Sequence, residues 1–197
     1  MEQLIDQVRT QIRDKTEPYL FNLKTDESPD ELENFVQHAL IDYSRYNPID
    51  NKIGSLALKE GVSLYDLPSD LMEMNSFPFP HQVIGLQLLL TDPPEVTMSV
   101  PYSYKAARDA KSVPLQDRPC VVWFASAQAL RAVISDSKKL DTYTSYKLQG
   151  VIEVDSRDVN KVITMLKDNA STYERLYNER IIPSESNGND TSFATFG

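Results

Sequence analysis

The chain has 197 residues, enough for one well-packed core or for a core with a smaller appendage. Its contents of hydrophobic residues (41%) and charged residues (25%) are ordinary for a soluble globular protein. The formal net charge of -9 argues against a nucleic-acid-binding role, which needs concentrated Lys and Arg, and the single cysteine, Cys120, excludes an intrachain disulfide.

An amphipathic helix is predicted at the N-terminus, over residues 2–16, ending before Pro18. Its apolar residues fall at helical spacing, at Leu4, Ile5, Val8 and Ile12. This stretch lacks the long apolar run of a signal peptide. The longest apolar run, over 83–90, is too short to cross a bilayer, so we expect no membrane association.

A second helix is predicted over 29–46 from its start and stop signals. Ser28 suits an N-cap, Pro29 suits the first helical position, and Glu31 completes a capping box. A continuous apolar stripe follows, formed by Leu32, Phe35, Val36, Ala39, Leu40 and Tyr43. The helix should end before Pro48, because the residue preceding a proline is disfavoured in the helical region.

The middle of the chain, residues 51–154, is predicted to form a mainly antiparallel β-rich region. The expected elements are a hairpin over 53–67 with its turn at 59–61, a strand over 83–90 buried on both faces, proline-interrupted edge strands over 92–104, and strands over 120–125 and 142–155. One segment, 126–137, fits either a short helix or a loop that lies over the sheet.

A long helix is predicted near the C-terminus, from a cap at Asp155 or Ser156 to about residue 180. The polar residues 181–197 are predicted to form a flexible tail. The predicted fold is therefore α+β: an antiparallel helical bundle (1–50 and 155–180) with an inserted β-rich region (51–154) and an extended C-terminal tail (181–197).

Residues that could support catalysis are sparse. The two histidines, His38 and His81, fall in different predicted elements, and Cys120 opens an apolar run where a buried, inert thiol is expected. The glycines are scattered and form no phosphate-binding motif. The short charged stretches over 108–111 and 137–141 are interpreted as solvated loop charges. We therefore expect no enzymatic activity, no cofactor and no metal site.

The phrase "ALIDYSRYNPID" crowds Tyr43, Arg45 and Tyr46 at the end of the second helix. This cluster could bind a partner, contact a nucleic acid or form the capped end of a helix. The acidic chain makes a nucleic-acid contact weak. Arg45 near the negative end of the helix dipole favours a structural role, in which the cluster fixes the angle between the bundle and the β region.

Two phrases resemble those of a known protein family. They are "ALIDYSRYNP" at the end of the second helix and "GVSLYDLPSDLMEM", with the pattern Y-x-L-P-x-D at Tyr65, Leu67, Pro68 and Asp70. This order resembles the head-to-tail connector, or adaptor, proteins of tailed bacteriophages. The resemblance covers residues 1 to about 90 and the closing helix, and no matching motif is found over 91–154.

The resemblance implies a virion structural protein of the head-tail connector region, made in the host cytoplasm. It would form a homo-oligomeric ring, a dodecamer, beneath the portal protein and join it to a tail or neck protein. Double-stranded DNA would pass through the lumen without specific binding, which suits an acidic channel lining. Partner contacts are predicted at Tyr43, Arg45 and Tyr46, and at Phe193 and Phe196 of the tail.

Other readings stay open. The chain could be a small soluble α+β enzyme or ligand-binding module, with a pocket in the β region around Trp123, Tyr102 and Tyr104. It could also be a tail-terminator or another neck ring protein, which differs from an adaptor in the rings that it contacts. The C-terminal tail could equally be disordered without a partner.

Overall fold

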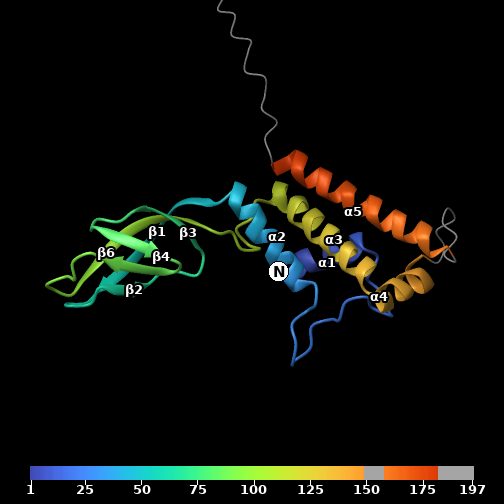
Figure 1. The fold of residues 1–197 in the computed structure, drawn as a ribbon, viewed down its shortest axis with the longest axis horizontal. Helices are drawn as coiled ribbons and strands as arrows, with labels where there is room; N and C mark the ends of the chain where they lie inside the picture. The colour runs from blue at the N-terminus through green and yellow to red at the C-terminus, as the bar shows by residue number, and fades with distance from the viewer. Residues whose placement is uncertain (149–157, 182–197) are drawn as a thin grey trace, which may run out of the picture. The chain divides into compact units, whose positions relative to one another are not determined.

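The computed structural model describes residues 1–148 and 158–181, which contain both α-helices and antiparallel strands. The predicted α+β class is confirmed. The chain divides into two compact units (Figure 1). The helical unit combines Met1–Ala39 with the described residues from Leu115 onward, and the β unit is Leu40–Pro114. The division falls inside α2 (Glu33–Tyr46), so the last two turns of this helix belong to the β unit.

The helical unit is built around α3 (Arg118–Ser135), which packs against α1 (Glu2–Gln11) and α5 (Val159–Ile181) (Figure 1). Much of α3 is buried, and many of its buried residues are small, which lets neighbouring helices approach closely. These small residues are Ala125, Ser126, Ala127 and Ala129. A short 3₁₀ turn precedes α3, and α4 (Ser137–Thr142) and a π-helical turn (Tyr143–Lys147) follow it.

A buried ionic network fixes the loop between α1 and α2. Arg9 is 5% exposed, and its guanidinium donates to Asp14 at 2.6 Å and to Asp30 at 2.8 and 2.9 Å. It also donates to the main-chain carbonyls of Phe21 and Asn22. One side chain thus satisfies acceptors at three points of the loop, which is what a buried charge requires.

Asp14 is fully buried and is the second centre of this network. It accepts from the N–H groups of Leu20 at 2.7 Å and Phe21 at 3.2 Å, and Lys147 lies 3.6 Å away. Burial raises the pKa of the Asp14 carboxyl, and these bonds together with Arg9 oppose the rise. Lys147 also donates to the carbonyl of Thr16, so the network connects the loop to the turn after α4.

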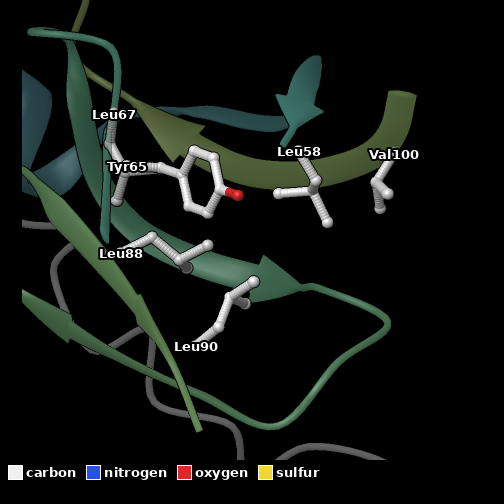
Figure 2. Close-up of a cluster of buried hydrophobic side chains, with 6 residues drawn as sticks. All are labelled: Leu58, Tyr65, Leu67, Leu88, Leu90 and Val100. Carbon is white, nitrogen blue, oxygen red and sulfur yellow. The ribbon is translucent and has the colours of Figure 1, made fainter. Parts of the chain in front are cut away.

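Two three-stranded antiparallel sheets form the β unit. The first has the order β1-β6-β3, with β1 (Ile49–Leu58), β6 (Met98–Ala106) and β3 (Leu71–Ser76). The second has the order β2-β5-β4, with β2 (Leu64–Asp66), β5 (Gln87–Leu90) and β4 (His81–Ile84). Figure 2 shows the core cluster of this unit: Leu58, Tyr65, Leu67, Leu88, Leu90 and Val100.

Gly54 in β1 lies directly opposite Tyr102 in β6. A Cβ atom added at Gly54 would lie 2.4 Å from Cζ of the Tyr102 ring, so the absence of a side chain makes room for this buried ring. The Tyr102 ring stacks on Tyr104, with centroids 5.5 Å apart. The packing of the Tyr102 ring therefore requires a glycine at position 54, which lies in a regular part of the β1–β6 ladder.

The predicted strand over 120–125 is wrong, because these residues lie in α3. The run "CVVWFA" belongs to a helix with little polar surface, so its apolar residues do not show a one-sided periodicity. The helical alternative for 126–137 is confirmed up to Ser135. The predicted strand over 142–155 is wrong for its described part, which is helical, and 149–155 lie outside the described residues. The β-rich region therefore ends at Ala106, far short of residue 154.

Strand partners also differ from the prediction. The hairpin over 53–67 is wrong: its turn exists at 59–61, but β1 pairs with β6 and β2 pairs with β5. The single strand over 83–90 is instead the β4–β5 hairpin, which turns at Gly85 with φ of 60°. Of the proline-interrupted edge strands predicted over 92–104, the described strand is β6, and it is central in its sheet.

Pro101 is tolerated in β6 because it faces only one neighbour. It lies opposite Ser55 of β1, whereas the pairing of β6 with β3 covers only Ser103 to Ala106. A missing N–H group can therefore point away from a ladder partner.

Helix ends differ from the prediction as well. The first helix ends at Gln11 instead of residue 16, and Arg13 adopts a left-handed φ of 61° just beyond it. The second helix begins at Glu33 instead of residue 29, and its predicted capping box is wrong: Ser28 bonds Thr25, and Asp30 accepts from the N–H of Leu32. The closing helix is confirmed from Val159 to Ile181. Its predicted caps and the tail over 182–197 lie outside the described residues.

Candidate functional site

The sequence-predicted cluster at the end of α2 separates into one buried and two exposed side chains. Tyr43 is 1% exposed and is part of the core. Tyr46 is 54% exposed, and Arg45 is exposed with its guanidinium 3.6 Å from Asp42 one turn earlier. Arg45 and Tyr46 are thus accessible to a partner, whereas Tyr43 is not. Their role in partner binding stays a prediction, and Phe193 and Phe196 lie outside the described residues.

Arg108, just after β6, is the residue that holds the end of α2. Its Nε donates to the carbonyl of Asn47 at 2.7 Å, and a terminal nitrogen donates to the carbonyl of Pro48 at 3.1 Å. The other terminal nitrogen donates to the carbonyl of Ser112 at 2.8 Å. A guanidinium placed at a helix C-terminus satisfies carbonyls that have no helical partner and stabilises the helix dipole.

Ser44 completes this arrangement from the last turn of α2. Its buried hydroxyl donates to the carbonyl of Leu40 at 2.6 Å and accepts from the main-chain N–H of Arg108 at 2.8 Å. The loop after Arg108 is ordered by Asp109, whose carboxylate accepts from the N–H groups of Lys111 and Ser112. Hydrogen bonds from the Ser112 hydroxyl and N–H lower the pKa of Asp109.

Arg108 lies in the stretch 108–111, which was interpreted from the sequence as solvated loop charges. This interpretation is wrong for Arg108, because its guanidinium donates to three main-chain carbonyls. The same holds for Lys139 in the stretch 137–141, which pairs with Glu31 and lies 4.0 Å above the ring of Phe21. Each of these cations contacts residues far away along the chain. No local pattern of charges distinguishes such a cation from one in solvent, so neither Arg108 nor Lys139 could be recognised from the sequence.

The motif Y-x-L-P-x-D supports the β unit. Tyr65 and Leu67 belong to its core cluster (Figure 2). The Tyr65 hydroxyl accepts from the N–H of Lys59 at 2.9 Å and donates toward the carbonyl of Val62 at 2.8 Å, which fixes the turn between β1 and β2. Asp70 pairs with Lys52. In this structure the motif therefore explains local packing.

An exposed apolar surface lies on the second sheet, on the side away from its core cluster. Leu64 of β2 lies directly opposite Leu89 of β5. Ile84 of β4 lies opposite Gln87 of β5, and Gln87 is on the same face of the sheet as Leu89. Leu86, in the turn between Ile84 and Gln87, is exposed as well. The exposed fractions are 50% for Leu64, 36% for Leu89, 61% for Ile84 and 45% for Leu86. We call these four residues the β surface.

The residues suggested for a ligand pocket in the β region belong to two different units. Trp123 belongs to α3 in the helical unit, whereas Tyr102 and Tyr104 are buried in β6 of the β unit. Trp123 lines a small cavity of about 260 Å³, together with Gln7 and Gln11 among others. Trp123 therefore lies outside the β region, in a hollow of the helical unit.

Titratable residues outside the ionic network are scattered. His38 is exposed, and the ring of His81 packs 5.2 Å from Phe77. Cys120 is buried, which raises the pKa of its thiol and keeps it protonated. Within residues 1–148 and 158–181, no three His, Cys, Asp or Glu side chains gather in a way that could hold a metal ion.

None of the described helices is long and apolar enough to span a membrane. Comparison with known proteins found no family model that matches the chain and no curated protein similar to it.

Proposed function

We propose that the chain is a virion structural protein, a head-to-tail adaptor that assembles as a ring beneath a portal and links it to the neck or tail. The observation that carries this proposal is the β surface, where Leu64, Leu89 and Ile84 are exposed on one face of the second sheet beside Asp66, Gln82 and Gln87, and Leu86 is exposed at its turn. Apolar side chains gathered on one face of a small sheet are characteristic of a surface that a partner covers.

Three further features support an adaptor in particular. The phrases "ALIDYSRYNP" and "GVSLYDLPSDLMEM" resemble those of the adaptor family. The β unit is inserted between helices, which agrees with what the resemblance implies. The net charge of -9 suits a channel past which DNA moves without adhering.

The mechanism in this proposal is geometric. The helices would pack side by side as an antiparallel bundle and form the body of the ring, with each lateral contact joining two different faces of neighbouring copies. One end of the ring would dock on the portal, and the β surface would meet the next ring of the neck or tail. Individually weak contacts would be reinforced by the many copies, so the free protein can stay unassembled until it meets the portal.

The test is reconstitution with the portal protein encoded near the same gene. Mass photometry and electron microscopy would compare the chain alone, the portal ring alone and the mixture. The expected result is a portal ring that carries additional copies of the chain on one face. Failure to bind that portal ring would refute the adaptor role, and binding to a tail-tube ring instead would favour a tail-terminator or neck protein.

A pair of variants tests the part played by the β surface. Ile84→Lys places a charge on this surface, at a side chain of the edge strand β4 that is 61% exposed and therefore contributes little to folding. It should leave portal docking intact and abolish attachment of the next component. Ser69→Lys, at an exposed residue before β3, is the matched control and should assemble like the unaltered protein. Equal attachment by both variants would contradict this use of the surface.

A further inference from the structure

The outer edge of β1 is the longest free strand edge in the β unit. β1 is the terminal strand of the order β1-β6-β3, and its only ladder partner among the described strands is β6. In an antiparallel ladder every second residue directs its N–H and C=O away from the neighbouring strand. Residues 53–58 therefore present a row of backbone donors and acceptors along this edge.

This edge lacks the features that normally prevent strand pairing. Residues 53–58, "IGSLAL", contain no charge and no proline, and their pairing with β6 is regular. The register irregularity of β1 lies before Lys52. By contrast, β3 has two register irregularities, β2 has three residues and β4 has four. Long, regular and uncharged edges accept another strand.

Side-chain exposure agrees with an uncovered edge. Ile53 is 79% exposed, and Ser55 and Ala57 on the same face are also exposed. The opposite face carries Leu56 and Leu58, which point toward the core of the unit. A strand added to β1 would therefore extend an existing core face and an existing solvent face at once, provided that its own side chains alternate in the same way.

We infer that β1 pairs with β1 of a second copy of this chain, antiparallel and about a two-fold axis at Leu56. In this register Ser55 lies opposite Ala57, and Gly54 lies opposite Leu58. Each of these pairs contains at least one small residue, and no two charges of like sign lie opposite each other. By the same count Lys52, whose ammonium pairs with Asp70 in its own copy, faces Glu60 in the turn that follows the strand of the second copy, and the two-fold axis repeats this arrangement of opposite charges. Cross-strand pairs of this kind stabilise a ladder.

The inference does not rest on the virion role, because it concerns the chain before any other protein is present. A two-fold contact joins identical patches, whereas the ring contacts proposed above join two different faces. The two can therefore be tested independently, and loss of the β1 contact should leave portal binding measurable.

Cysteine cross-linking tests the register directly in the full chain, with the buried Cys120 replaced by alanine. An equal mixture of Ser55→Cys and Ala57→Cys proteins places two thiols directly opposite each other, within reach of a disulfide after mild oxidation. The mixture should form a disulfide-linked dimer that is absent when Ser69→Cys, an exposed control in the same unit, replaces either variant. No more linked dimer than in this control would overturn the inference.

Charge reversal tests the contact without new cysteines. Glu60→Lys brings a lysine opposite Lys52, and Glu95→Lys makes the same change in net charge at an exposed residue outside β1. Sedimentation velocity should show a shift from dimer to monomer for Glu60→Lys and no shift for Glu95→Lys. A chain that is monomeric at all concentrations, or equal behaviour of both variants, would refute the pairing. Circular dichroism of both variants checks that the fold is retained.

Discussion

Replacing Arg108 by alanine should destabilise the β unit, because this side chain closes the end of α2. Arg108 donates three side-chain hydrogen bonds, to the carbonyls of Asn47, Pro48 and Ser112 at 2.7, 3.1 and 2.8 Å. Its main-chain N–H bond to Ser44 does not depend on the side chain and would remain. The perturbation therefore removes the guanidinium and leaves the backbone connection in place.

The size of the loss follows from these three bonds. A hydrogen bond from a charged donor contributes roughly 1.5–3 kcal/mol when it is shielded from water. Arg108 is only half-buried, so water can solvate part of what the substitution uncovers. We expect Arg108→Ala to lower the free energy of unfolding by about 2–4 kcal/mol. Arg108→Lys should recover less than half of this loss, because one ammonium group cannot reproduce the planar fork of donors.

Urea unfolding, followed by hydrogen exchange at residues 43–48, measures the effect and locates it. Faster exchange should appear at Asn47, whose N–H donates to the carbonyl of Tyr43 at 3.0 Å. The matched control is Arg45→Ala, since Arg45 is exposed and its ion pair with Asp42 should contribute less than about 0.5 kcal/mol. If Arg108→Ala and Arg45→Ala unfold at the same urea concentration, the role given to Arg108 is refuted.

Three other predictions concern buried charge, close packing and pH. Arg9→Met leaves the Asp14 carboxylate buried without its nearest cation, so urea unfolding should show a loss of about 3–5 kcal/mol, and unchanged stability would contradict the network. Gly54→Ala places a methyl group against the ring of Tyr102; thermal unfolding should show a loss of about 1–3 kcal/mol, partly recovered by adding Tyr102→Leu. The lowered pKa of Asp109 stabilises the fold above the unfolded-state pKa, and this contribution disappears as pH falls through the folded-state pKa. The difference in unfolding free energy between the unaltered chain and Asp109→Asn should therefore shrink below about pH 4, and a difference independent of pH would argue against it.

Sequence reasoning located part of the candidate site and missed the rest. It identified the end of α2, and the exposed Arg45 and Tyr46 lie there. It missed Arg108, which follows α2 by some sixty residues and reaches the helix end only through the fold. The β surface was missed for a related reason: the run over 83–90 is apolar except for Gln87, and only the turn at Gly85 assigns Leu89 and Ile84 to an exposed face.

The sequence by itself determined the elements that are buried on one side. The stripes of α2 and α5 repeat at helical spacing because each helix has a solvent face, and local periodicity records that asymmetry. Only the tertiary structure decided the state of α3, whose apolar and small residues are largely buried and therefore carry no clear period. It also decided that β1 pairs with β6 across some forty residues, since strand pairing depends on contacts that no local pattern records.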